Sequence, residues 1–74
     1  MEDRVKAIMA DVFMIDASAI GPDASVNTID QWDSLAQINL IAALEEEFGV
    51  QFDVEEFERM TSFTELLEAL SGKL

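Results

Sequence analysis

The chain has 74 residues and half of them are hydrophobic, which is enough apolar material for one small core. Sixteen acidic residues against four basic ones give a formal net charge of −12. This charge excludes nucleic acid and anionic membranes as binding partners, because both are bound through Lys and Arg, and it suits basic protein partners. The absence of Cys and His excludes a disulfide framework, a thiolate metal site and a histidine general base.

The N-terminal residues alternate charged and apolar side chains, so they do not form a secretory signal. No apolar run approaches the length of a membrane span. We therefore expect one domain over residues 1–74, monomeric and cytoplasmic.

The first predicted element is an amphipathic helix over residues 3–15. Its apolar residues follow the helical spacing i, i+3, i+4, i+7, i+8: Val5, Ile8, Met9, Val12 and Phe13. Residues 16–33 are predicted to form a long loop, because Gly21, Pro22 and Asp23 favour turns. Apolar residues recur along this loop, which indicates that it packs on the core: Ile20, Val26, Ile29 and Trp32.

The main helix is predicted over residues 34–48, with apolar side chains around more than half its circumference and Gly49 as its C-cap. A short third helix is predicted over 52–60, with Asp53 and Glu56 as a capping pair. A last helix over 62–70 begins with the capping box Ser62 and Glu65. No strand alternation is present. The expected fold is an all-α four-helix bundle, three main helices plus a short third helix, with a long loop between helices 1 and 2.

Ser34 stands at the start of the main helix and allows three interpretations. Ser34 and Gln37 match the capping box S-x-x-Q, although Asp33 could equally be the N-cap. Nucleophilic catalysis is disfavoured, because the chain has no His and its four basic residues lie far from Ser34 in sequence. The third interpretation is a covalently attached phosphate, which the free N–H groups and the dipole of a helix N-terminus would stabilise.

The motif "DSL" at 33–35, opening a helix that runs to "ALEEEFG" at 43–49, resembles the acyl carrier protein family. The resemblance covers essentially the whole chain, including its acidity, its long first loop and the final "T-x-F-x-E-L" pattern. It implies that a phosphopantetheinyl transferase esterifies Ser34 with 4′-phosphopantetheine from coenzyme A. The thiol of this arm would carry acyl groups as thioesters between enzymes of fatty acid or polyketide biosynthesis, and the chain itself would catalyse nothing.

The resemblance also implies roles for residues near Ser34. Asp33 would help the transferase to position its metal and the serine, and Leu35 would pack against partner enzymes. Acidic residues of the second and third helices would meet basic patches on acyl-loading and acyl-transferring enzymes: Glu45, Glu46, Glu47, Glu55 and Glu56. The alternative for each glutamate is an ordinary solvated position.

Some positions depart from the family pattern. Ala36 and Asn39 stand where members that serve bulk fatty acid synthesis usually have acids, and Trp32 precedes the motif. We expect a carrier of a dedicated pathway whose partners recognise Trp32, Ala36 and Asn39. For the Trp32 indole itself, we favour a place in the core over direct contact with a partner. The bulky Phe57 and Phe63 predict that only short or polar cargo is sheltered.

Two alternatives remain open on the sequence alone. The first is an aminoacyl or peptidyl carrier, which would use the same arm on Ser34. The second is a non-covalent acidic interaction module that docks a basic partner. Modification of Ser34 distinguishes the second alternative from either carrier.

Overall fold

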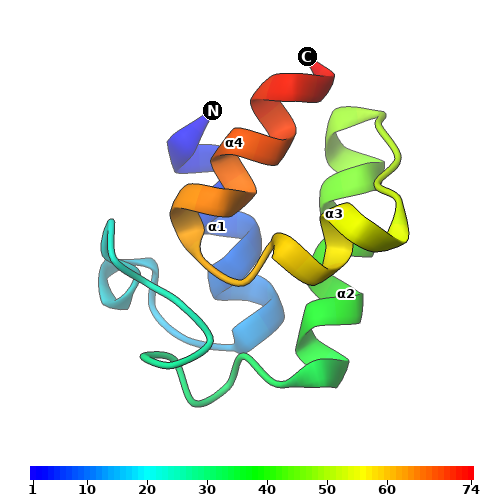
Figure 1. Cartoon of the computed structure of the whole chain (residues 1–74). Helices are drawn as coiled ribbons and strands as arrows, with labels where there is room; N and C mark the ends of the chain where they lie inside the picture. Colours follow the sequence, from blue (N-terminus) through cyan, green and yellow to red (C-terminus); the bar gives the residue numbers. More distant parts are fainter.

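The computed structural model describes residues 1–74 and shows an all-helical fold, which confirms the predicted fold class (Figure 1). One isolated bridge, between Ser25 and Ser62, is the only strand-like pairing. The elements in chain order are α1 (Glu2–Phe13), the 3₁₀ turn η1 (Ala17–Ala19), α2 (Ser34–Phe48), α3 (Val54–Arg59) and α4 (Phe63–Lys73). None of these helices is both long and apolar enough to cross a membrane.

A single core lies between α1, α2, α4 and the long loop. Its 14 buried hydrophobic residues are Val5, Met9, Phe13, Ile20, Ala24, Ile29, Trp32, Leu40, Ile41, Leu44, Met60, Phe63, Leu66 and Leu70. The loop anchors Ile20, Ile29 and Trp32 are buried as predicted, whereas Val26 is 38% exposed. The apolar ring predicted around α2 is also incomplete, because Leu35 and Ile38 at its first turns face solvent.

The start of α2 was predicted correctly, and so was its end. Gly49 adopts the left-handed conformation with φ 65° and its N–H donates to the Glu45 carbonyl, which makes it the expected C-cap. The first helix is shorter than predicted, because Met14 adopts the same left-handed conformation, with φ 58°, and ends α1 after Phe13. Nothing equivalent stops α4 at residue 70, and the helix continues to Lys73.

The short helix α3 has the predicted capping box, although the helix begins two residues later than expected. Asp53 Oδ1 accepts from the Glu56 N–H at 2.8 Å, and Glu56 Oε1 accepts from the Asp53 N–H at 3.1 Å. The box predicted for α4 is half formed. Ser62 Oγ accepts from the Glu65 N–H at 3.2 Å, while the Glu65 carboxylate accepts from the hydroxyls of Ser62 and Thr61.

The long loop is fixed in its middle to the turn between α3 and α4. The Phe63 N–H donates to the Ala24 carbonyl at 2.9 Å, and the Val26 N–H donates to the Thr61 carbonyl at 3.0 Å. In Figure 1 the loop accordingly runs from the end of α1 past the start of α4 before it reaches α2. These bonds and the buried anchors confirm that the loop is packed down and is not a free linker.

Candidate functional site

Asp33, and not Ser34, is the N-cap of α2. Its Oδ1 accepts from the Ala36 N–H at 2.8 Å, and Asp33 has the extended backbone typical of a cap, with φ −98° and ψ −173°. Ser34 is the first helical residue, so of the two caps that the sequence allowed, the capping box of Ser34 and Gln37 does not form. The Ser34 side chain is exposed, and its hydroxyl takes part in no hydrogen bond within the chain.

The backbone around Ser34 is suited to an anion. The N–H groups of Ser34 and Leu35 have no acceptor within the chain, since the first acceptors of α2 serve Ala36 and Gln37. The positive end of the dipole of this 15-residue helix lies at the same place, and apart from the N-cap Asp33 its first turn contains no acidic residue. Ser34 Oγ is therefore free, accessible and placed where a phosphate ester is stabilised, so the residues present fit a phosphate-linked arm.

A groove of ≈ 480 Å³ runs beside Ser34 between the start of α2, α3 and the long loop. Its walls include the apolar side chains of Val26, Ile38 and Phe57, with Trp32 and Gln37 at its inner side. A flexible arm attached to Ser34 could lie along this groove, because Ser34 itself forms part of the lining.

Exposed apolar side chains lie at the start of α2 and at the start of α3. Leu35 is 68% exposed and Ile38 is 55% exposed, one turn apart on the same face of α2. Val54, the first residue of α3, is 72% exposed. Asn39 is exposed as well, while Ala36 is half-buried. The first acid along α2 is Glu45, so the surface next to Ser34 on this helix is apolar and uncharged.

Some of the acidic residues predicted to meet partners form hydrogen bonds or ion pairs within the chain, and others do not. Glu46 and Glu55 are exposed and form no ion pair. Glu45 Oε2 accepts from the Phe52 N–H at 2.8 Å, and Glu47 pairs with Arg4. Only Glu46 and Glu55 are therefore free carboxylates on α2 and α3 among those expected to meet partners.

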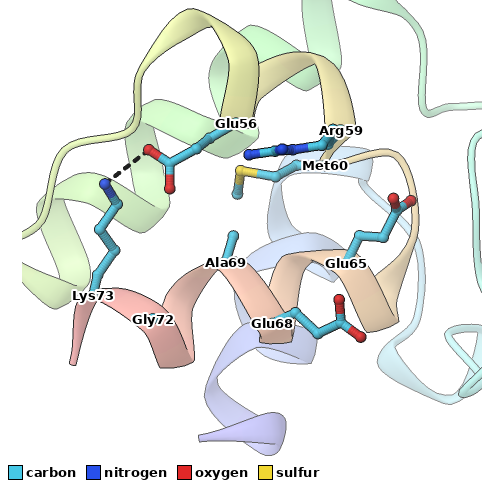
Figure 2. Close-up of a pocket in the computed structure, with 8 residues that line it drawn as sticks. All are labelled: Glu56, Arg59, Met60, Glu65, Glu68, Ala69, Gly72 and Lys73. Carbon is cyan, nitrogen blue, oxygen red and sulfur yellow. Dashed lines mark ion pairs between the residues drawn. The ribbon is translucent and has the colours of Figure 1, made fainter.

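Glu56 has a structural partner on α4. Figure 2 shows Lys73 reaching across from α4 to this carboxylate, with Nζ 2.8 Å from Oε1. The hydrogen bond from Lys73, followed by that from the Asp53 N–H, lowers the pKa of Glu56 below its usual value. Lys73 Nζ also lies 5.7 Å from the centre of the Phe52 ring. This carboxylate helps to fasten α3 to α4, a role that its position in the sequence did not reveal.

Trp32 belongs to the core, which is the interpretation that the sequence favoured over direct partner contact. Only 3% of it is exposed, and its ring packs against Phe13 with the ring centres 5.2 Å apart. Its indole N–H donates to Gln37 Oε1 at 2.5 Å. A partner would therefore touch little of Trp32 directly, because the indole is covered by its own chain.

Gln37 was not identified from the sequence as a residue of interest beyond capping. It is 7% exposed and is the only buried polar residue. The signal that could have revealed it is its register, since Gln37 precedes the buried Leu40, Ile41 and Leu44 by three, four and seven positions. A polar side chain in a buried stripe needs internal hydrogen-bond partners.

Comparison with known proteins points to one family. A family model described as the phosphopantetheine attachment site matches residues 3–70. An acyl carrier protein of Thermosynechococcus vestitus is 39% identical over 72 residues, covering 97% of this chain and 89% of that protein. The chain belongs to the acyl carrier protein family.

Other relatives agree with this assignment. An acyl carrier protein of Nitratidesulfovibrio vulgaris is 33% identical over 73 residues, covering 99% of this chain and 96% of the relative. One of Petrotoga mobilis is 35% identical over 72 residues, covering 97% and 85% respectively. The predicted family is confirmed, and with it 4′-phosphopantetheine as the covalent prosthetic group of this carrier.

Proposed function

We propose that Ser34 is the attachment point of the arm and that the chain carries acyl groups for a dedicated biosynthetic pathway of the fatty acid or polyketide kind. The observation that carries this proposal is the free, exposed hydroxyl of Ser34 at the start of α2, where Asp33 already serves as the cap. Within a family defined by phosphopantetheine attachment, this hydroxyl combines accessibility with an anion-stabilising helix end.

In the attachment step, Ser34 Oγ forms a bond to the phosphorus that bears the pantetheine of coenzyme A. The diphosphate P–O bond breaks and 3′,5′-adenosine bisphosphate leaves. The serine proton passes to a base of the transferase, because no basic side chain of this chain lies at Ser34. Asp33 keeps one carboxylate oxygen uncommitted beside the serine and offers it to the transferase and its metal. When attached, the arm supplies a terminal thiol that carries the cargo as a thioester.

The surface around Ser34 suits enzymes that combine an apolar pocket with basic side chains. Leu35 and Ile38 would enter the pocket, and Glu46 and Glu55 would face the bases. These enzymes are the phosphopantetheinyl transferase and the acyl-loading and acyl-transferring enzymes of the pathway. The carrier catalyses no step itself.

The uncharged first turns of α2 support a dedicated pathway over bulk fatty acid synthesis. The double substitution Ala36→Asp with Asn39→Glu adds acids to this surface, and Asn39 is exposed while Ala36 is half-buried. We expect the double variant to be used faster than the wild type by a ketosynthase of fatty acid synthesis. An unchanged rate would contradict this explanation.

The decisive experiment is the intact mass after incubation with coenzyme A and a promiscuous phosphopantetheinyl transferase. We expect a gain of one phosphopantetheine on the wild type and on Ser71→Ala, a matched variant at another exposed serine, and no gain on Ser34→Ala. No gain on the folded wild type, with a reference carrier modified in the same tube, would favour the non-covalent interaction module. Loading with acyl and aminoacyl donors then distinguishes the two kinds of carrier.

A further inference from the structure

The short helix α3 packs one side chain of its own, Phe57, against the core and otherwise depends on residues outside it. It has six residues, none of them buried, and a helix of this length does not persist alone in water. Its position depends on Met60, which follows it and is 1% exposed, on the ion pair from Lys73, and on hydrogen bonds from Gln37.

Gln37 joins α3 to the segment that precedes Ser34. Its Nε2 donates to the carbonyls of Met60 at 2.8 Å and Phe57 at 3.2 Å, at the C-terminal end of α3. Its Oε1 accepts from Trp32 Nε1 at 2.5 Å. Both amide hydrogens and the amide oxygen of Gln37 are thus used, and the side chain links α2, α3 and the long loop at one point.

This link lies at the inner wall of the groove beside Ser34. Trp32, Gln37 and Phe57 all line the groove, and the core of the bundle contains the fully buried Leu40, Leu44 and Leu66. A cargo chain moving from the groove toward this core would have to displace Gln37. The carbonyls of Phe57 and Met60 would then face an apolar chain without a donor, which is unfavourable for buried polar groups.

We propose that Gln37 is the specificity-determining residue that limits how deeply cargo enters the bundle. It closes the wall between α2 and α3, so that short cargo lies in the groove and the distal part of longer cargo remains outside the core. This inference rests on the proposed attachment at Ser34, and it assigns the limit on cargo to one polar side chain in addition to the bulk of Phe57.

The test compares wild type, Gln37→Leu and the matched control Gln51→Leu, whose glutamine is exposed. Each protein is loaded with acetyl- or octanoyl-phosphopantetheine and verified by intact mass. The half-life of each thioester is measured in mildly alkaline buffer, and amide chemical shifts are compared between the two loaded forms. Amide exchange at Phe57 and Met60 is measured on the unmodified proteins, so that α3 is examined without any arm.

We expect the two thioesters to have the same half-life on wild type and on Gln51→Leu, with shift differences confined to the groove. Gln37→Leu should lengthen the octanoyl half-life relative to acetyl about fivefold, which corresponds to about 1 kcal/mol. Its shift differences should reach Leu44 and Leu66. Amide exchange at Phe57 and Met60 should be faster in this variant alone.

Several results would overturn the proposal. The proposal is overturned if the octanoyl thioester already has a longer half-life than the acetyl thioester on the wild type. It is also overturned if Gln37→Leu has wild-type thioester half-lives and wild-type amide exchange in α3. Gln37→Met, which keeps the length of the side chain, replaces the leucine variant if that variant loses its helical circular dichroism. A missing mass gain would refute attachment at Ser34 before any half-life is measured, so the two failures are distinguishable.

Discussion

Asp33 caps α2 and, in the proposed function, also serves the transferase through its charge, and two substitutions separate these roles. Its Oδ1 caps α2 through the Ala36 N–H at 2.8 Å, and its negative charge lies next to Ser34. Asp33→Asn keeps a good N-cap acceptor and removes only the charge. Asp33→Ala removes both.

The magnitudes follow from these contacts. Loss of an N-cap lowers the free energy of unfolding by about 1 kcal/mol, and loss of a negative charge at a helix N-terminus by about 0.3–1 kcal/mol. We therefore expect about 1–2 kcal/mol for the alanine variant and less than about 1 kcal/mol for the asparagine variant. In a domain of this size, 1 kcal/mol lowers Tm by roughly 4–8 °C.

The assay pairs thermal unfolding, followed by circular dichroism, with the rate at which Ser34 accepts the arm, followed by intact mass. Both variants should accept the arm more slowly than the wild type. Only the alanine variant should lose most of the stability that the N-cap contributes. Asp30→Ala is the control, because Asp30 is exposed and makes no side-chain hydrogen bond. Equal losses of stability in the two variants would refute the capping argument, and a wild-type rate for Asp33→Asn would refute a role for the charge.

Three further predictions concern stability. Met14 has a left-handed backbone, with φ 58°, and its side chain is 89% exposed. Met14→Gly should therefore remove backbone strain without loss of packing and raise the free energy of unfolding, measured by urea titration, by about 0.5–1 kcal/mol. Met14→Ala should not raise it, because alanine is strained in the same conformation. Lys73→Gln removes the main cause of the lowered pKa of Glu56. The stabilisation by this ion pair is complete above pH 4.5, the ordinary pKa of a glutamate, and is lost as pH falls through the lower pKa that Glu56 has in the folded protein. In urea titrations the free energy of unfolding of the variant should therefore be lower than that of the wild type at neutral pH, and the difference should become smaller in acid. With a net charge of −12, the wild type should gain Tm when NaCl is raised from about 0.01 M to about 0.15 M, because salt screens self-repulsion, and a fall in Tm would mean that attractive ion pairs dominate.

Helix positions could be predicted from the sequence wherever a local signal marks them. Gly49 and the apolar period give the end of α2, and the pair Asp53 and Glu56 indicates that α3 exists, although its start was predicted two residues too early. The end of α1 was missed, because Met14 carries no intrinsic preference for the left-handed conformation that it adopts. The end of α4 was predicted too early, at residue 70, where the apolar stripe ends. No terminating signal follows there, and the helix continues through Gly72 to Lys73.

The candidate site likewise contains features that the sequence marks locally and features that depend on the folded structure. Ser34 stands out locally, but the identity of the cap does not, because Asp and Ser are almost equally good N-caps and only the backbone of Asp33 decides between them. The bonds of Gln37 reach carbonyls 20 and 23 residues away, and Arg4 meets Glu47 across 43 residues. Contacts of this kind depend on the packing of α1, α2 and α3, which no periodicity encodes.

The bonds that fix the long loop come from residues that are synthesised late. Ala24 and Val26 are held by Phe63 and Thr61, which lie at the junction of α3 and α4. A ribosome releases the N-terminal part of the chain first, so Ser34 emerges on a nascent chain whose loop still lacks these partners. The groove, which Phe57 and Thr61 help to line, is completed only after these residues leave the exit tunnel. A transferase that recognises the finished surface would therefore find it only after the junction of α3 and α4 has folded against the loop.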